Sequence, residues 1–173
     1  IDTTEELYYG FGEVHLCENL LGTDYVRFIE REYPELLSLV RKRHGVPEEA
    51  HELTWITDQA IDFIERQAAS STPFFCHCSF HELSPPCTPP LGYEGHHDPA
   101  DMPVPILDPK DLDGKPPFYR QCYEGYLARG RQPDETVLRK AIASCYDQMR
   151  FIDHQFGRLM QTLDQCGISD NTI

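Results

Sequence analysis

The stretch that decides the expected fold is Pro73-Phe74-Phe75-Cys76-His77-Cys78-Ser79-Phe80-His81. It is apolar, rich in aromatic residues and of strand length, and it leads into the proline-stiffened loop Ser84-Pro85-Pro86-Cys87-Thr88-Pro89-Pro90. A buried strand that ends in a loop with polar side chains is a common place for the site of an α/β protein. The stretch therefore predicts a central strand and marks the region in which to look for chemistry.

The residues before this stretch predict a helix. Trp55, Ala60 and Ile64 recur at helical spacing within residues 54–69, and charged side chains fill the opposite face. A helix followed by a short link and an apolar strand is an α-to-β connection, which is typical of sheets with parallel strands. The expected fold class is therefore α/β, with part of a mostly parallel, mixed sheet flanked by helices.

Two further segments carry helix signals. Thr23 or Asp24 can cap a helix that Pro34 restarts and Gly45 ends. Asp134 can cap a long helix that closes at Gly167. Apolar residues recur along this long helix at steps of three and four, which predicts one strip docked on the rest of the domain. The strip consists of Leu138, Ile142, Cys145, Met149, Ile152, Phe156, Leu159, Leu163 and Cys166.

The remaining segments define the expected domain organisation. Residues 83–133 are interpreted as a proline-rich loop excursion, because proline fixes φ and removes a backbone donor. The sequence begins at Ile1, and Thr172-Ile173 follow the turn signal Ser169-Asp170-Asn171 as the start of a strand would. We interpret residues 1–173 as a single partial domain from the interior of a longer protein.

Composition limits the possible partners. The net charge of −14 argues against nucleic acid or an anionic membrane as the main partner, because both require basic patches. No stretch approaches the roughly 20 apolar residues of a membrane span. The seven cysteines are odd in number and contain no C-x-x-C pair, which favours free thiols and a reducing compartment such as the cytoplasm.

Two clusters contain residue types that bind metals. Strand alternation sends Cys76 and Cys78 to one face and His77 to the other, so these three side chains cannot converge on one ion. The loop His96-His97-Asp98 has no further ligand at suitable spacing nearby. We therefore predict no metal site within this chain.

Several segments, taken in order, resemble the central portion of the sulfatases, a family of the alkaline-phosphatase superfamily. They include Thr54-Trp55-Ile56-Thr57-Asp58-Gln59-Ala60-Ile61-Asp62-Phe63-Ile64 and the aromatic stretch quoted above. The others are residues 88–90, 98–105, 146–159 and 167–173. Each match is short, but their joint order is specific to the family.

The resemblance implies a hydrolase of sulfate monoesters, with a small molecule or a saccharide sulfate as its substrate. The family makes a formylglycine nucleophile from a C/S-x-P-x-R motif and holds the sulfate oxygens with a divalent cation, usually calcium. This sequence contains no such motif. The family's lysine-and-histidine motif and its aspartate-bearing metal motif also fall outside the matched region. The chain alone is therefore expected to be inactive.

One family site position falls inside the chain. Sulfatases carry a histidine after the aromatic strand, in a pattern like S-F-x-x-P-H-x-P, and counting from Ser79-Phe80 places Ser84 at that position. A serine hydroxyl can donate a hydrogen bond but cannot act as a cationic imidazole. His81 is a possible substitute, and Glu82 is a candidate substrate contact.

Further candidates lie in the excursion. Tyr93, His96 and His97 could stack on or hydrogen-bond to a sugar or aromatic group of a substrate. The same side chains could instead anchor the loop to the body of the protein.

Three alternatives stay open at this point. One is a phosphonate or phosphodiester hydrolase of the same superfamily, because the charge and geometry of these anions are similar. Another is a degenerate, non-catalytic sulfatase-like binding protein, which the serine at position 84 suggests. The last is a stand-alone α/β binding module.

Overall fold

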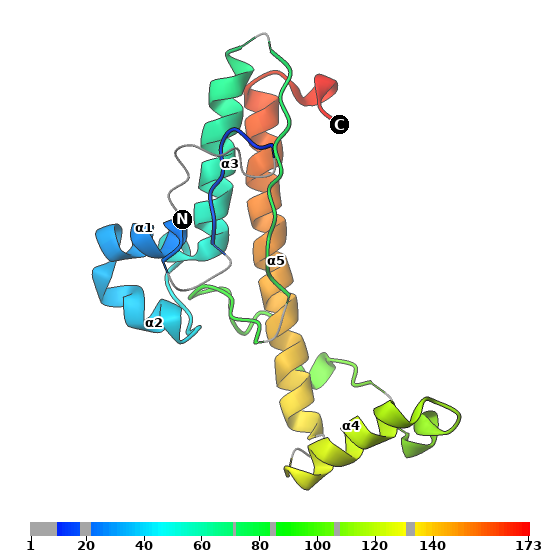
Figure 1. Ribbon diagram of the computed structural model, residues 1–173. Helices are drawn as coiled ribbons and strands as arrows, with labels where there is room; N and C mark the ends of the chain where they lie inside the picture. Colours follow the sequence, from blue (N-terminus) through cyan, green and yellow to red (C-terminus); the bar gives the residue numbers. More distant parts are fainter. Residues whose placement is uncertain (1–9, 18–21, 71, 84–85, 106–107, 131–133) are drawn as a thin grey trace.

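The computed structural model describes residues 10–17, 22–70, 72–83, 86–105, 108–130 and 134–173, and within these ranges it consists of helices and irregular segments (Figure 1). The regular elements follow one another along the chain as α1 Asp24–Glu32, η1 Pro34–Leu36, α2 Leu37–Arg41, η2 Glu48–Ala50, α3 Glu52–Ala68, η3 Pro99–Asp101, η4 Pro109–Leu112, α4 Pro117–Ala128, α5 Glu135–Gln165 and η5 Ser169–Asn171. None of these helices is both long and apolar enough to cross a bilayer.

The first helical region forms most of the hydrophobic core. The helix α1 ends before Pro34, which starts the 3₁₀ turn η1, and the chain continues into α2 as the sequence predicts. The Tyr25 hydroxyl donates a hydrogen bond of 2.8 Å to the Ala50 carbonyl, which ties α1 to the residues before α3. The buried core consists of Cys17, Tyr25, Ile29, Val40, Val46, Ala50 and Trp55.

The helices α3 and α5 form the long axis of the molecule (Figure 1). They lie side by side and run in the same direction, because His51 contacts Phe151 and Asp58 pairs with Arg158. The Asp134 side chain caps α5 by accepting a hydrogen bond from the Val137 amide, as predicted. Both helices confirm the sequence prediction in type and in approximate extent.

The predicted strand is not present, and the α/β fold class is therefore wrong for this structure. Residues 72–83 are extended coil, and no backbone hydrogen bond joins them to another described segment. A strand requires a hydrogen-bonded neighbour, and the described part of the chain offers none. The side chain of Phe75 is 74% exposed, whereas a central strand would bury it. Thr172-Ile173 likewise form no strand.

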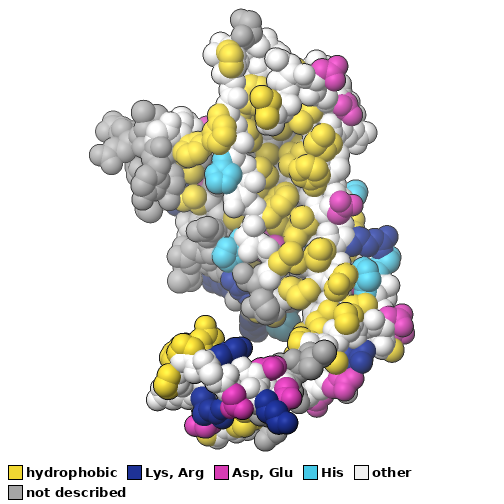
Figure 2. All heavy atoms as spheres, turned by 90° about the vertical axis from the view of Figure 1, so that its right-hand side faces the viewer, with side chains coloured by type: hydrophobic (Ala, Val, Ile, Leu, Met, Phe, Trp, Pro, Cys, Tyr) yellow, Lys and Arg dark blue, Asp and Glu magenta, His cyan; other side chains and the backbone are white. Residues whose placement is uncertain are grey.

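The docked face of α5 also differs from the prediction. The residues buried on this helix are Ala143, Asp147, Gln148, Phe151, Gln155 and Thr162. Most of them are polar, and no member of the predicted apolar strip is buried. Met149 and Phe156 of that strip are among the exposed large hydrophobic residues. Figure 2 shows a band of hydrophobic side chains along this side of the molecule.

The described residues of the excursion 83–133 include helical elements as well as loops. They contain the short turns η3 and η4 and the helix α4, which projects away from the α3–α5 pair (Figure 1). Met102 is buried and anchors the excursion, as its apolar character suggests. The Arg139 guanidinium on α5 donates hydrogen bonds to the carbonyls of Ala100 and Met102. The helix α4 was missed because the proline density upstream of it dominates the sequence signal.

Candidate functional site

A small cavity lies where the extended segment meets the N-terminal end of α3. Its volume is about 50 Å³, and it combines acidic, basic and aromatic side chains. The lining residues are Tyr25, Val40, Arg43, His44, Val46, His51, Glu52, Glu82, Pro86 and Thr88. Of the sequence candidates that the structure describes, Glu82 alone lines this cavity.

Two carboxyl groups share this cavity. Glu52, in the first turn of α3, hydrogen-bonds through its side chain to Glu82. Burial raises the pKa of Glu52 to about 8, and the hydrogen bond and negative charge of Glu82 act in the same direction, against a smaller effect of Arg43. At neutral pH the pair therefore holds a proton that Glu52 can donate.

The buried His51 holds the other side of the cavity in place. Its Nδ1 accepts a hydrogen bond of 3.2 Å from the Leu53 amide at the start of α3, so its Nε2–H donates to the Thr88 carbonyl at 3.1 Å. Burial lowers the pKa of His51, which keeps the ring neutral. Both ring nitrogens are occupied, so His51 positions the segment around Thr88.

His81 lies in a different hollow. It lines a groove of about 530 Å³ between residues 11–17, one side of α3 and the extended segment, together with Trp55 and Phe63. The next residue, Glu82, lines the small cavity instead. The structure therefore does not bring these two candidates together.

Tyr93 packs against α5. Its ring centroid lies 4.7 Å from that of Phe151, in an edge-to-face arrangement. Burial raises the pKa of Tyr93, and the charge of Glu48 and its hydrogen bond with the Tyr93 side chain contribute further. These contacts anchor the loop to the α3–α5 pair.

His97 is held by a buried carboxylate of α5. Asp147 Oδ1 lies 2.7 Å from His97 Nδ1 and accepts the His97 amide at 3.1 Å, while Oδ2 accepts the Gly95 amide at 2.7 Å. The Asp147 side chain is only 4% exposed, and the His97 ring is about one third exposed. The neighbouring His96 is exposed. Asp147 thus fixes the turn that presents both histidines.

Ser84, the residue at the family's histidine position, lies outside the described residues. Within the described ranges, no group of three or more His, Cys, Asp or Glu side chains is placed to hold a metal ion. The family resemblance places the ligands of its divalent cation outside the matched region.

Sequence reasoning missed Glu52 and Asp147. A glutamate in the first turn of a helix is common because it complements the helix dipole, so Glu52 carries no distinguishing signal. Asp147 falls next to the predicted apolar strip and reads as an ordinary polar-face residue. An acidic residue on the docked face becomes visible only once the face itself is known.

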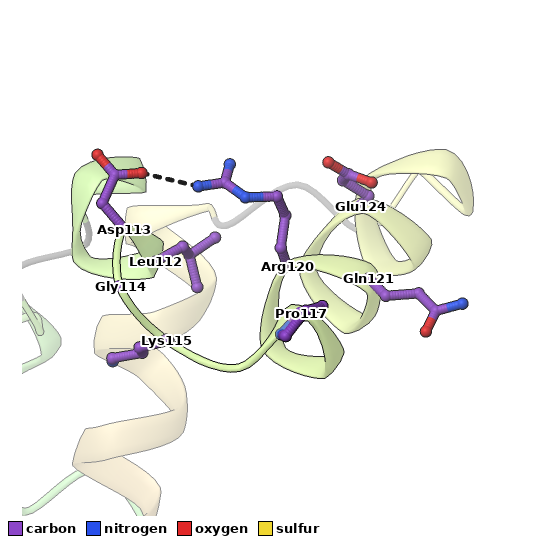
Figure 3. Close-up of a pocket in the computed structure, with 8 residues that line it drawn as sticks. All are labelled: Leu112, Asp113, Gly114, Lys115, Pro117, Arg120, Gln121 and Glu124. Carbon is purple, nitrogen blue, oxygen red and sulfur yellow. Dashed lines mark hydrogen bonds and ion pairs between the residues drawn. The ribbon is translucent and has the colours of Figure 1, made fainter.

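A further hollow lies beside α4, away from all of these residues. Its volume is about 430 Å³, and it is lined by Leu112, Asp113, Gly114, Lys115, Pro117, Arg120, Gln121 and Glu124. Figure 3 shows Asp113 and Arg120 directed at each other, and their ion pair measures 2.8 Å. The side chains of Asp113 and Arg120 are 72% and 48% exposed, which is typical of a solvated surface pair.

The described residues define a helical protein with a small cavity at the N-terminal end of α3 that holds the paired carboxyl groups of Glu52 and Glu82, and sequence comparison adds its family. The chain is 30% identical over 142 residues to an arylsulfatase of Clostridium perfringens (strain 13 / Type A), covering 79% of this chain and 27% of that protein. It is 26% identical over 131 residues to the human (Homo sapiens) iduronate 2-sulfatase, covering 68% of this chain and 23% of that protein.

These matches show that the chain is related to the sulfatase family. It spans about a quarter of the length of the curated relatives it matches. No protein-family model and no solved structure matches the chain.

Proposed function

We propose that this chain is part of a sulfatase-like hydrolase that cleaves sulfate monoesters. The observation that carries the proposal is the pair of matches to an arylsulfatase and an iduronate 2-sulfatase, which cover most of this chain. Both relatives are named for sulfate ester hydrolysis, although they differ in the class of substrate. Small aromatic or saccharide sulfates are therefore the substrates to test.

The proposed mechanism places the nucleophile and the cation outside the described residues. A formylglycine would come from a C/S-x-P-x-R motif, which these 173 residues do not contain. A divalent cation, when bound, would neutralise the sulfate oxygens. Among the described residues, no three His, Cys, Asp or Glu side chains are grouped to hold a metal ion, and the family resemblance places the ligands outside this chain. The contribution that we propose for this chain is to shape the site and supply protons.

Within this proposal, Glu82 and Thr88 border the substrate. Glu82 and Thr88 lie in the same small cavity, and His51 holds Thr88 in place through its carbonyl. Glu52 is protonated at neutral pH because it is buried against Glu82. A protonated carboxyl beside a leaving group can supply the proton that an imidazole would otherwise donate.

The test is hydrolysis of 4-nitrophenyl sulfate by the protein produced from its complete coding sequence. We expect sulfate turnover above that of 4-nitrophenyl phosphate and of 4-nitrophenyl phenylphosphonate. Ser84→Ala should lower kcat/KM, and Glu52→Gln should lower kcat without a comparable change in KM. Exposed Glu65 on the same helix provides the matched control, Glu65→Gln.

If the protein hydrolysed the phosphate or the phosphonate faster than the sulfate, that ester and not the sulfate would be its substrate class. Binding of a sulfated sugar without turnover of any ester would instead show a non-catalytic relative. Either result would overturn the proposal.

A further inference from the structure

Two cysteines from distant parts of the sequence meet beside the candidate site. Cys87 follows the extended segment, and Cys145 lies on α5. The Ser144 hydroxyl, next to Cys145 in the chain, donates a hydrogen bond of 2.9 Å to the Cys87 carbonyl, and the Cys145 thiol lies close enough to raise the pKa of the Cys87 thiol. Both thiols are partly exposed, so a small reagent can reach them.

Hydrogen bonds from neighbouring segments hold the backbone around Cys87 in place. The backbone of Cys87 is held on one side by Ser144, and the following residue is held by two bonds to other segments. The Thr88 hydroxyl donates to the Arg43 carbonyl at 3.2 Å, and the Thr88 carbonyl accepts from His51. The backbone around Cys87 is therefore held beside the turn of α5 that carries Cys145.

We propose that Cys87 and Cys145 are a modification site, a thiol pair that closes to a disulfide under oxidising conditions and fastens the segment around Thr88 to α5. The sequence expectation of scattered free thiols stands for the reduced form, in which no disulfide joins the described cysteines. The proposal does not rest on sulfatase activity.

The chemistry needs a small-molecule disulfide as the oxidant, for which oxidised glutathione serves as the probe. The Cys145 thiolate attacks one sulfur of the glutathione disulfide, a mixed disulfide forms, and one glutathione thiolate leaves. The Cys87 thiolate then attacks the Cys145 sulfur, the protein disulfide forms, and the second glutathione leaves. Two protein thiols lose two electrons, and one glutathione disulfide gains them.

The rate of closure depends on pH. Burial raises the pKa of the Cys87 thiol to about 12, and the nearby Cys145 thiol contributes. The thiolate is the attacking species in both steps, so closure should speed up as the pH rises.

The test is oxidation of the full chain by oxidised glutathione, followed by alkylation of the remaining thiols and peptide mapping by mass spectrometry. We expect one cross-linked peptide pair that contains Cys87 and Cys145. Cys87→Ser should abolish this pair and leave a glutathionyl group on Cys145. Cys122→Ser, at an exposed position on α4, is the matched control and should leave the cross-link unchanged.

A second measurement does not depend on any variant. The disulfide would close the loop between Cys87 and Cys145. This should raise the midpoint of thermal unfolding of the wild-type chain by about 10 °C, and reduction should reverse the shift. Failure to form the pair would overturn the proposal. So would cross-links spread evenly over the other cysteines, or a midpoint that does not move when the pair forms.

Discussion

At the scale of single residues, Gln148 is an unusual component of the interface between α5 and its neighbours. It is fully buried, and neither its Nε2 nor its Oε1 has a hydrogen-bond partner among the described residues. Burying an amide without partners costs about 1–3 kcal/mol. Gln148→Met keeps the side-chain length and removes both polar atoms, so it should raise the free energy of unfolding by about 1 kcal/mol in a urea titration.

The matched control for this substitution is Gln155→Met. Gln155 is equally buried and its Nε2 also has no hydrogen-bond partner among the described residues, but its Oε1 accepts a hydrogen bond of 2.8 Å from Arg158. Its replacement should leave stability unchanged or lower it, because a made bond is lost. A lower stability of Gln148→Met than of wild type would contradict the interpretation.

The Glu52–Glu82 pair predicts a pH dependence of stability. The pKa of Glu52 rises from an ordinary 4.5 to about 8 on folding, so the folded state binds the extra proton between these values. The contribution of protonated Glu52 to the stability of the folded state is fully present below pH 4.5, and it is lost as the pH rises through about 8. Thermal unfolding midpoints measured from pH 4 to pH 9 should show this decline.

A comparison with Glu52→Gln isolates the contribution of this group. The amide stays neutral at every pH and can still donate to Glu82, so the variant should lack the decline. His51, whose pKa is lowered by burial, changes stability in the opposite direction but is common to both proteins. Equal pH profiles for wild type and variant would rule out the shared proton.

The sequence predicts little at the residue scale. The positions of Tyr93, His96 and His97 in the excursion marked them as candidates, and Tyr93 and His97 are the ones that contact α5. Asp147 lies 50 residues beyond its partner His97, and Phe151 lies still further beyond Tyr93. Contacts over such separations depend on how the elements pack, which single-residue chemistry does not determine.

At the scale of elements, Asp147 joins the excursion to α5. Asp147→Ala leaves the amides of Gly95 and His97 without their acceptor and releases the His97 ring. We expect a loss of about 1–3 kcal/mol in the free energy of unfolding. Amide hydrogen exchange at Gly95 and His97 should accelerate more than exchange in α3.

Asp153→Ala on the exposed side of the same helix is the control, and it should change neither quantity. If the Asp147→Ala loop exchanged at the wild-type rate, the carboxylate would not be the anchor.

The elements themselves were predictable where their signals are local. The helices α3 and α5 follow from apolar spacing, capping by Asp134, and Gly167 with its φ of 69°, which only glycine adopts without strain. The extended segment was predicted as a strand from its composition, yet a strand also needs a partner. The side chains of Phe74, Cys78 and Phe80 are half-buried in partial alternation, so the extended geometry is correct and the pairing is what fails.

At the scale of the whole molecule, the face of α5 that is buried is not the face that the sequence predicts. The helix was predicted to dock its apolar strip, but most of the residues that it buries are polar. Asp147 and Phe151 on the buried face contact the excursion. Helical periodicity locates an apolar strip correctly without identifying what covers it. The fold class was predicted wrongly for the same reason, because a sheet is a property of several segments together.

The uncovered strip predicts the association behaviour of the 173-residue chain. Met149 and Phe156 on α5 are 47% and 56% exposed, and together with the exposed Phe75 they leave large hydrophobic side chains open to water. Soluble monomers rarely expose contiguous apolar patches of more than a few hundred Å², so we expect this strip to pair with the same strip of a second copy. The net charge of −14 opposes this pairing, and salt screens the repulsion.

Sedimentation velocity should therefore show a monomer at low ionic strength and a growing dimer fraction as sodium chloride is added. The double substitution Met149→Gln and Phe156→Gln keeps the net charge and removes the apolar contacts. Each buried side chain of this size contributes about 1.5–3 kcal/mol, so the variant should shift the dimerisation constant towards the monomer by at least about tenfold. Phe118→Gln removes an exposed aromatic ring from α4 and should leave association unchanged. A chain that stays monomeric at every salt concentration would show that the strip is too fragmented to drive pairing by itself.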